Sequence, residues 1–81
     1  MKVAMNWSYY PKAPKHWDSV LPHGYFIVVE KNDDGDNEYV AYEGDYDDWR
    51  LFNKPGPTRI GAYDTLDRAK KAAEVHDAAK P

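Results

Sequence analysis

Two segments rich in β-branched and aromatic residues flank a short acidic sequence near the middle of the chain. The first, GYFIVVEK at residues 24–31, and the second, NEYVAYEG at 37–44, both have the composition of β-strands. Between them stands DDGD, in which Asp34 and Gly35 suit the two central positions of a type I′ turn. The sequence therefore predicts an antiparallel hairpin. Counting outward from this turn, the predicted opposite residues are Asp33 and Asp36, Lys31 and Glu38, Val29 and Val40, and Ile27 and Tyr42.

This register assigns every side chain of the hairpin to one of two faces, because opposite residues share a face. The predicted core face carries Tyr25, Ile27, Val29, Val40 and Tyr42. The second face carries Phe26, Val28, Glu30, Tyr39, Ala41 and Glu43. One helix covers only one face, so the apolar residues of the second face need cover from Trp7 or Trp17, from a second copy, or from another protein. A shift of the register by one residue would exchange the faces.

The segments after the hairpin complete the predicted fold. WRLFNK at 49–54 is predicted as a third strand that ends at the PGP sequence of 55–57, and RIGAY at 59–63 is predicted as a short extended piece. Residues 64–80 have the pattern of a helix whose inward face is mostly alanine. Asp64 is the predicted N-cap, and Asp67 stands three residues further on as in a capping box.

The N-terminal third predicts one strand and one loop. Val3, Met5, Trp7 and Tyr9 alternate with smaller or polar residues, as in a half-buried strand. The prolines that follow favour an irregular loop. We therefore predict one domain over residues 1–81, with a strand and a proline-rich loop at 1–23, an antiparallel sheet at 24–63 and a helix at 64–80. The predicted fold class is α+β, with a three- to four-stranded antiparallel sheet and one C-terminal helix packed on one face.

The length and composition limit the function classes. A chain of 81 residues supports one small core and leaves little room for a deep, water-excluding active site, so we do not expect an enzyme. The sequence contains no Cys, which removes disulfides, thiolate zinc sites and cysteine catalysis. No apolar run has the length of a signal peptide or a membrane span, so we expect a cytoplasmic protein that does not enter a membrane.

The net charge of -3 conceals an acidic block in the middle of the chain. Residues 30–48 have a net charge of -8, whereas residues 1–29 and 49–81 have net charges of +2 and +3. The block includes Asp33, Asp34, Asp36, Glu38, Glu43, Asp45, Asp47 and Asp48. An acidic rather than a basic block argues against a general nucleic-acid-binding protein.

Three interpretations of this block compete. A calcium loop would use Asn32, Asp34, Asp36 and Glu38, but Gly35 comes too early for an EF-hand and no Glu stands at its twelfth position. Carboxylates spaced along strands instead resemble the charges of a nucleic-acid backbone, and the matching partner is a basic groove. A solvated hairpin with acidic ends is the third interpretation. We predict no metal and no cofactor, and the last two interpretations stay open.

The histidines suggest no catalytic site. No pair has the i, i+4 spacing of helical metal ligands. His16 and Asp18 are both capable of acid–base chemistry, but such close neighbours in a predicted loop rarely converge. His76 falls in the apolar half of the helix near its C-terminus, where the helix dipole favours a cation, and is predicted to be half-buried.

The sequence GAYDTLDRAKKAAEVHD, residues 61–77, resembles the ending of many small proteins encoded by phages and prophages, in which a short antiparallel sheet precedes a helix of the type TLEEAKAAAE. The DNA-arm domains of phage-type integrases have a similar plan. Residues 67 and 68 are Asp and Arg where that pattern prefers two Glu. The resemblance implies a protein of a mobile element, and it carries no catalytic residues to transfer.

We therefore expect a non-enzymatic acidic binding protein that docks on a host protein or ribonucleoprotein complex. One form of this hypothesis is a phage-borne inhibitor of a nucleic-acid-handling defence system, of the anti-CRISPR or anti-restriction type, acting in the host cytoplasm. The predicted contact residues are Asp33, Asp34, Asp36, Asp45, Tyr46, Asp47, Asp48, Trp49, Phe26 and Tyr39. The alternative is an accessory domain that binds nucleic acid through its sheet, with Lys12, Lys15, Arg50, Lys54 and Arg59 as its cations. A homodimer is compatible with either.

Overall fold

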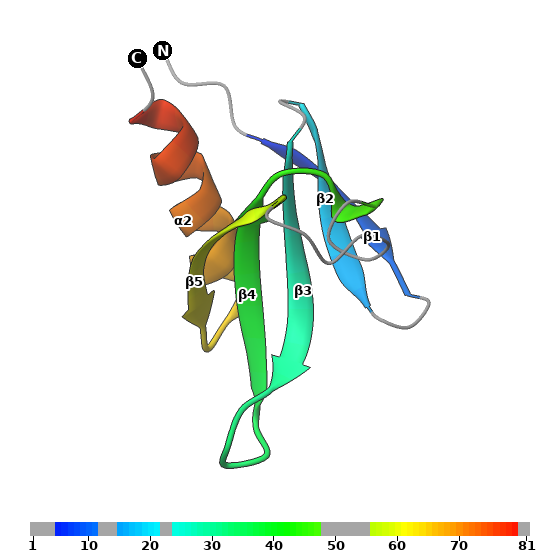
Figure 1. Cartoon of the computed structure of the whole chain (residues 1–81), viewed down its shortest axis with the longest axis vertical. Helices are drawn as coiled ribbons and strands as arrows, with labels where there is room; N and C mark the ends of the chain where they lie inside the picture. Colours follow the sequence, from blue (N-terminus) through cyan, green and yellow to red (C-terminus); the bar gives the residue numbers. More distant parts are fainter. Residues whose placement is uncertain (1–4, 12–14, 22–23, 48–55, 80–81) are drawn as a thin grey trace.

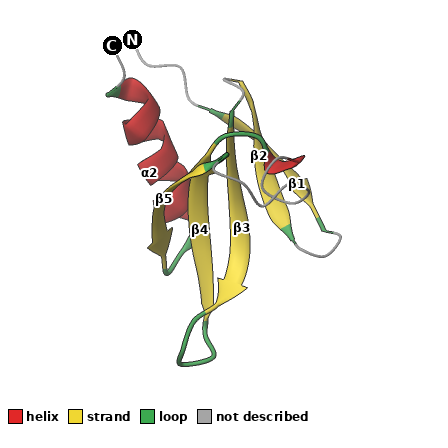
Figure 2. Cartoon of the chain, in the orientation of Figure 1, coloured by secondary structure: helices red, strands yellow, loops and turns green. Residues whose placement is uncertain are grey.

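The computed structural model describes residues 5–11, 15–21, 24–47 and 56–79. It contains an antiparallel sheet of five strands in the order β1-β2-β3-β4-β5 and the helix α2 (Figures 1 and 2). The elements are β1 (Asn6–Tyr10), β2 (His16–Leu21), β3 (Tyr25–Lys31), β4 (Asn37–Glu43), β5 (Thr58–Tyr63) and α2 (Leu66–Ala78). The predicted α+β class with a C-terminal helix on the sheet is confirmed. The predicted strand number of three to four is wrong.

β2 is the strand that the sequence did not predict. It pairs with β1 on one side and with β3 on the other, so residues 16–21 belong to the sheet and not to an irregular loop. The prolines that favoured a loop, at positions 11, 14 and 22, all lie outside the bounds of this strand. The predicted third strand at 49–54 lies outside the described residues, and the extended piece at 59–63 is part of β5.

The hairpin forms as predicted, but its register differs by one residue. Val28 lies opposite Val40, and Lys31 lies opposite Asn37. The connection is longer than a type I′ turn because the Asn32 side chain organises it: Asn32 Oδ1 accepts hydrogen bonds from the backbone N–H groups of Asp34 and Asp36, at 2.9 and 3.0 Å. The predicted division of β3 into two faces is correct, with Ile27 on one face and Phe26 on the other. Those of β4 are exchanged, so that Val40 and Tyr42 share a face with Phe26, and Tyr39 and Ala41 share a face with Ile27.

α2 packs on one face of β3, β4 and β5, behind the sheet in the view of Figure 1. Its contact residues are small: Ala69 and Ala73 are fully buried, and Ala69 packs against Ile27 and Ala41. Alanines allow a close approach of helix and sheet, so the rings around them provide most of the buried apolar area. These rings include Trp7, Trp17, Tyr39 and Tyr63.

Polar contacts hold both ends of α2. Thr65 is the N-cap, and its Oγ1 accepts from the Arg68 N–H at 3.2 Å, so the predicted cap at Asp64 is wrong by one residue. Near the other end, Tyr25 Oη donates to Asp77 Oδ1 at 3.1 Å. Burial and this hydrogen bond raise the pKa of Tyr25 to about 12. His76 is half-buried as predicted, with Nδ1 3.7 Å from Glu43 Oε1.

Candidate functional site

We call the sheet face opposite α2 the helix-free face. By the register of the strands it carries Ser8, Tyr10, His16, Asp18, Phe26, Val28, Glu30, Glu38, Val40, Tyr42 and Arg59. Its centre is apolar, since Phe26, Val28 and Val40 are buried. Of the covers that the sequence left open for this face, Trp7 and Trp17 do not provide it, because both pack in clusters on the side of α2. Part of the cover comes from the segment that follows β4.

Gly44 turns this segment back over the helix-free face. Its φ of 142° lies in the region that favours glycine, and its N–H donates to the Gly24 carbonyl at 2.6 Å. A Cβ at this position would lie 2.7 Å from the Cα of Pro57. The turn places Tyr46 on the sheet, where its side chain is buried and its ring meets the Phe26 ring edge to face at 5.5 Å.

His16 lies between two tyrosine rings on this face. The Tyr46 ring stacks on it with centroids 3.7 Å apart, and the Tyr10 ring stacks on it at 4.9 Å. His16 Nε2 lies 3.4 Å from Asp18 Oδ2. The expectation that His16 and Asp18 do not converge is therefore wrong, because residues two apart on a strand point to the same side.

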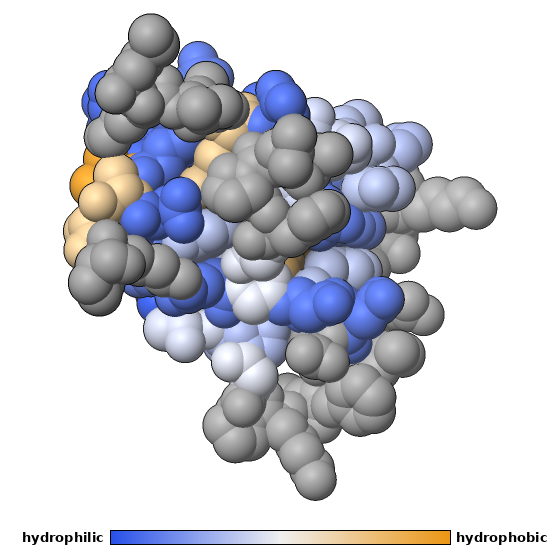
Figure 3. All heavy atoms as spheres, turned by 90° about the horizontal axis from the view of Figure 1, so that it is seen from above, coloured by the Kyte–Doolittle hydropathy of each residue, from blue (hydrophilic) through white to orange (hydrophobic). Residues whose placement is uncertain are grey.

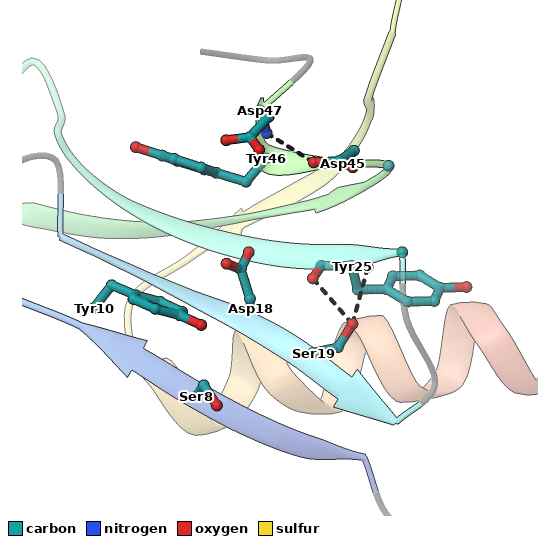
Figure 4. A pocket seen from close by; sticks show the side chains of 10 residues that line it. Ser8, Tyr10, Asp18, Ser19, Tyr25, Asp45, Tyr46 and Asp47 are labelled. Carbon is teal, nitrogen blue, oxygen red and sulfur yellow. Dashed lines mark hydrogen bonds between the residues drawn. The ribbon is translucent and has the colours of Figure 1, made fainter. Parts of the chain in front are cut away.

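Tyr10, Asp18 and Tyr46 also border a hollow of about 650 Å³, which we call the acidic pocket. Its lining includes Ser8, Tyr10, Asp18, Asp45, Tyr46 and Asp47. Figure 4 shows the Asp18 side chain rising from β2 toward the segment that carries Asp45 and Asp47. The Asp47 N–H donates to Asp45 Oδ1 at 2.8 Å, which fixes the orientation of the Asp45 carboxylate. Carboxylates from two distant parts of the chain thus face one open space.

The charge of Asp18 is poorly compensated in this pocket. Burial raises the pKa of Asp18, and the negative charges of Asp45 and Asp47 raise it further. His16 acts in the opposite direction through its charge and its hydrogen bond, but the net pKa shift is upward. The ionised carboxylate is therefore less stable here than in water.

A second group of carboxylates lies at the far end of the β3–β4 hairpin. Asp33, Asp34 and Asp36 are exposed in its connection. Glu30 and Glu38 stand directly opposite each other, an arrangement of like charges that destabilises a sheet. They border a hollow of about 410 Å³ together with Lys31 and Arg59, and Tyr42 Oη donates to Glu30 Oε2 at 3.3 Å. This end is acidic but contains cations of its own.

The predicted contact residues separate into three groups. The exposed Asp45 and Asp47 border the acidic pocket, and Asp33, Asp34 and Asp36 are exposed at the other end. Phe26 and Tyr46 are buried and are core residues, and Tyr39 packs on the opposite face beside Trp17. Asp48 and Trp49 lie outside the described residues. Asp18 was not among the predicted contact residues, although the alternation of His16 and Asp18 around Trp17 indicates that both side chains share a face.

No group of three or more His, Asp or Glu side chains within the described residues has the arrangement of a metal site. Comparison with known protein families, curated proteins and solved structures gives no match. The resemblance to phage-encoded proteins and integrase arm domains stays a prediction. None of the helices in the described ranges has the length and apolarity needed to cross a membrane.

Proposed function

We propose that the chain is a non-enzymatic binding protein whose acidic pocket docks on a positively charged surface of a protein or ribonucleoprotein complex. The observation that carries the proposal is the convergence of Asp18 from β2 with Asp45 and Asp47 from the segment after β4. Like charges held together around a partly buried carboxylate lower the stability of the free chain. An Arg or Lys side chain of a partner would relieve that cost, because an opposite charge favours the ionised form.

The shape of the site also supports docking rather than catalysis. The pocket is an open hollow on the face of a sheet, and its carboxylates are accompanied by hydroxyl groups and by the Tyr10 ring. Arg side chains bind carboxylates through paired hydrogen bonds and stack on aromatic rings, so a guanidinium group suits this lining. Cytoplasmic location remains part of the proposal.

The narrower form of the proposal concerns the partner's role. A complex that handles nucleic acid has a basic groove for the phosphate backbone, and an acidic face would compete for that groove. Competition for such a groove and the resemblance of residues 61–77 to phage-encoded proteins support a phage-borne inhibitor of the anti-CRISPR or anti-restriction type. The nucleic-acid-binding alternative receives no comparable support. Of its proposed cations only Lys15 and Arg59 lie among the described residues, and Arg59 lies beside Glu30 and Glu38.

The direct test compares two triple variants that remove the same number of charges. The first replaces Asp18, Asp45 and Asp47 with Asn, and the second replaces Asp33, Asp34 and Asp36 with Asn. A fluorescent arginine-rich peptide serves as the probe for a basic surface, and binding is followed by fluorescence anisotropy. We expect the first variant to weaken binding at least tenfold more than the second. Equal affinities for the two variants would contradict docking through the acidic pocket.

Identification of the partner requires a second experiment. Affinity capture from host lysate with mass spectrometry is compared between the natural chain and the Asp18, Asp45 and Asp47 triple variant. A partner lost only with the variant supports the proposal. A gel-shift assay at low salt tests the alternative, which predicts retardation of DNA or RNA.

A further inference from the structure

β1 is an edge strand of the described sheet and differs in composition from every other described element. Its sequence, NWSYY, contains no charged residue, whereas β2, β3, β4, β5 and α2 each contain at least one. Edge strands normally carry charges, prolines or bulges that prevent pairing with another strand. In β1 the register shift lies at Asn6 and Trp7, which leaves the remainder of the strand regular. β1 therefore lacks the usual protection over most of its length.

The two most exposed tyrosine rings also stand on β1. Tyr9 is 47% exposed and Tyr10 is 45% exposed, and they project to opposite faces of the sheet. Tyr9 packs against Trp17 with ring centroids 4.7 Å apart, and Tyr10 stacks on His16. Both rings are thus supported on their inner side and open on the outer side. A strand added beside β1 would bury ring surface on both faces and pair the backbone groups of the edge.

We propose that the occupant of this edge is β1 of a second copy of the chain, paired antiparallel about a two-fold axis. The register that aligns the whole strand is centred on Ser8, which then faces Ser8 of the partner subunit, while Trp7 faces Tyr9 of the partner subunit. β1 is self-complementary in this register. Aromatic residues meet aromatic residues on the side of α2. On the helix-free face the two Ser8 side chains meet and Asn6 faces Tyr10 of the partner subunit, and no like charges oppose each other within the strand pair.

The pairing has a consequence for the acidic pocket, although it does not depend on the proposed function. The two-fold axis of an antiparallel strand pair is perpendicular to the sheet, so both helix-free faces lie on the same side of the dimer. Ser8 and Tyr10 line the acidic pocket and also belong to β1. The two pockets therefore flank the joint and face one way, so that a dimer presents two acidic sites to one basic surface. Linked sites of this kind bind more tightly than single ones.

The absence of natural Cys makes the proposed register directly testable. Cβ atoms of directly opposite residues are about 5 Å apart, within reach of a disulfide after small adjustments. Ser8→Cys should therefore cross-link two chains rapidly under mild oxidation. Tyr10→Cys lies in the same strand, but its two copies would be about 13 Å apart along the joint. Thr58→Cys, on the opposite edge strand β5, is the matched control for an exposed thiol.

Sedimentation velocity of the natural chain from low micromolar to near-millimolar concentration completes the test. We expect the mass to rise from that of one chain, 9.3 kDa, toward twice that value. We also expect the Ser8→Cys chain to cross-link at least tenfold faster than the other two variants. A natural chain that stays monomeric throughout overturns the proposal, as does a Ser8→Cys chain that cross-links no faster than Thr58→Cys. Equal rates for Ser8→Cys and Tyr10→Cys overturn the register.

Discussion

Gly44 determines whether the acidic pocket exists, because it turns Tyr46 and the neighbouring aspartates over the helix-free face. We predict that Gly44→Ala lowers the free energy of unfolding by about 3 kcal/mol, since it adds a side chain both to a strained backbone conformation and against Pro57. Gly35→Ala is the matched control. Gly35 also has a positive φ, of 84°, but a Cβ there meets no atom within 4 Å. Urea denaturation should show a loss of only about 1 kcal/mol for the control; equal losses would contradict the close packing of Gly44 on Pro57.

Asp18 is expected to lower stability in the free chain. Its pKa is raised on folding, so the folded chain holds the proton more tightly than the unfolded chain, and ionisation at neutral pH favours unfolding. We predict that Asp18→Asn raises the free energy of unfolding at pH 7. The gain should shrink as the pH falls through the raised pKa of the folded chain toward 3.8, the ordinary pKa of Asp, and it should be lost below 3.8, where Asp18 is protonated in both states.

Chemical denaturation of both chains at pH 7 and at low pH measures this difference. The same variant should bind the arginine-rich peptide more weakly, so stability and binding change in opposite directions. A functional residue held in an unfavourable environment behaves in this way. If Asp18→Asn instead destabilises the chain at pH 7, the contact with His16 outweighs the burial of the carboxylate.

At the scale of single elements, the sequence predicted the hairpin, the extended piece at 59–63 and the helix, but it did not predict the hairpin register. The alternate residues of β4 form two similar sets: Glu38, Val40 and Tyr42 in one, and Tyr39, Ala41 and Glu43 in the other. Each set has one Glu and two apolar residues, so hydrophobic alternation does not choose between them. The connection decides, and there the side chain of Asn32 binds two backbone N–H groups. A local hydrogen bond of this kind leaves no trace in the hydrophobic pattern.

The same limit explains the incomplete prediction of the site. The acidic residues at 45 and 47 were visible in the sequence, but their neighbour Asp18 stands in a strand that proline content concealed. Phe26 and Tyr46 seemed available for a partner because nothing in the sequence showed that they cover each other. Which residues meet across a small sheet depends on strand order and register, and an error in either moves contact residues into the core.

The start of α2 provides a test of one corrected element boundary. We predict that Thr65→Ala lowers the free energy of unfolding by about 1 kcal/mol, because it removes the acceptor of the Arg68 N–H. Asp64→Ala should have a smaller effect, since the exposed ion pair of Asp64 Oδ1 with Arg68 Nη1 at 3.5 Å contributes little. Thermal denaturation of both variants distinguishes the two caps. A larger loss for Asp64→Ala would place the cap at Asp64 after all.

At the scale of the whole molecule, charge and hydrophobicity are unevenly distributed. Seen from above, hydrophilic residues dominate the described surface and hydrophobic ones gather on the side of α2 (Figure 3). Acidic groups border the helix-free face at both ends. The edge strand β1, which belongs to the same sheet, is uncharged. The two proposed interactions therefore use different forces. Docking on a basic surface depends on charge attraction, whereas pairing through β1 depends on backbone hydrogen bonds and burial of rings.

Salt should separate these two interactions by moving them in opposite directions. Added salt screens the attraction between the acidic pocket and a basic partner, so binding of the arginine-rich peptide weakens. It also screens the repulsion between the two acidic pockets that flank the β1 joint, so the dimer should become tighter. Sedimentation and anisotropy series at low and high salt measure the two dissociation constants on the same preparation.

The Asp18, Asp45 and Asp47 triple variant should lose both responses, because it removes the charges on which each depends. A dimer that weakens with salt as steeply as peptide binding would instead place acidic residues in attractive contacts across the joint, contrary to the uncharged pairing proposed for β1.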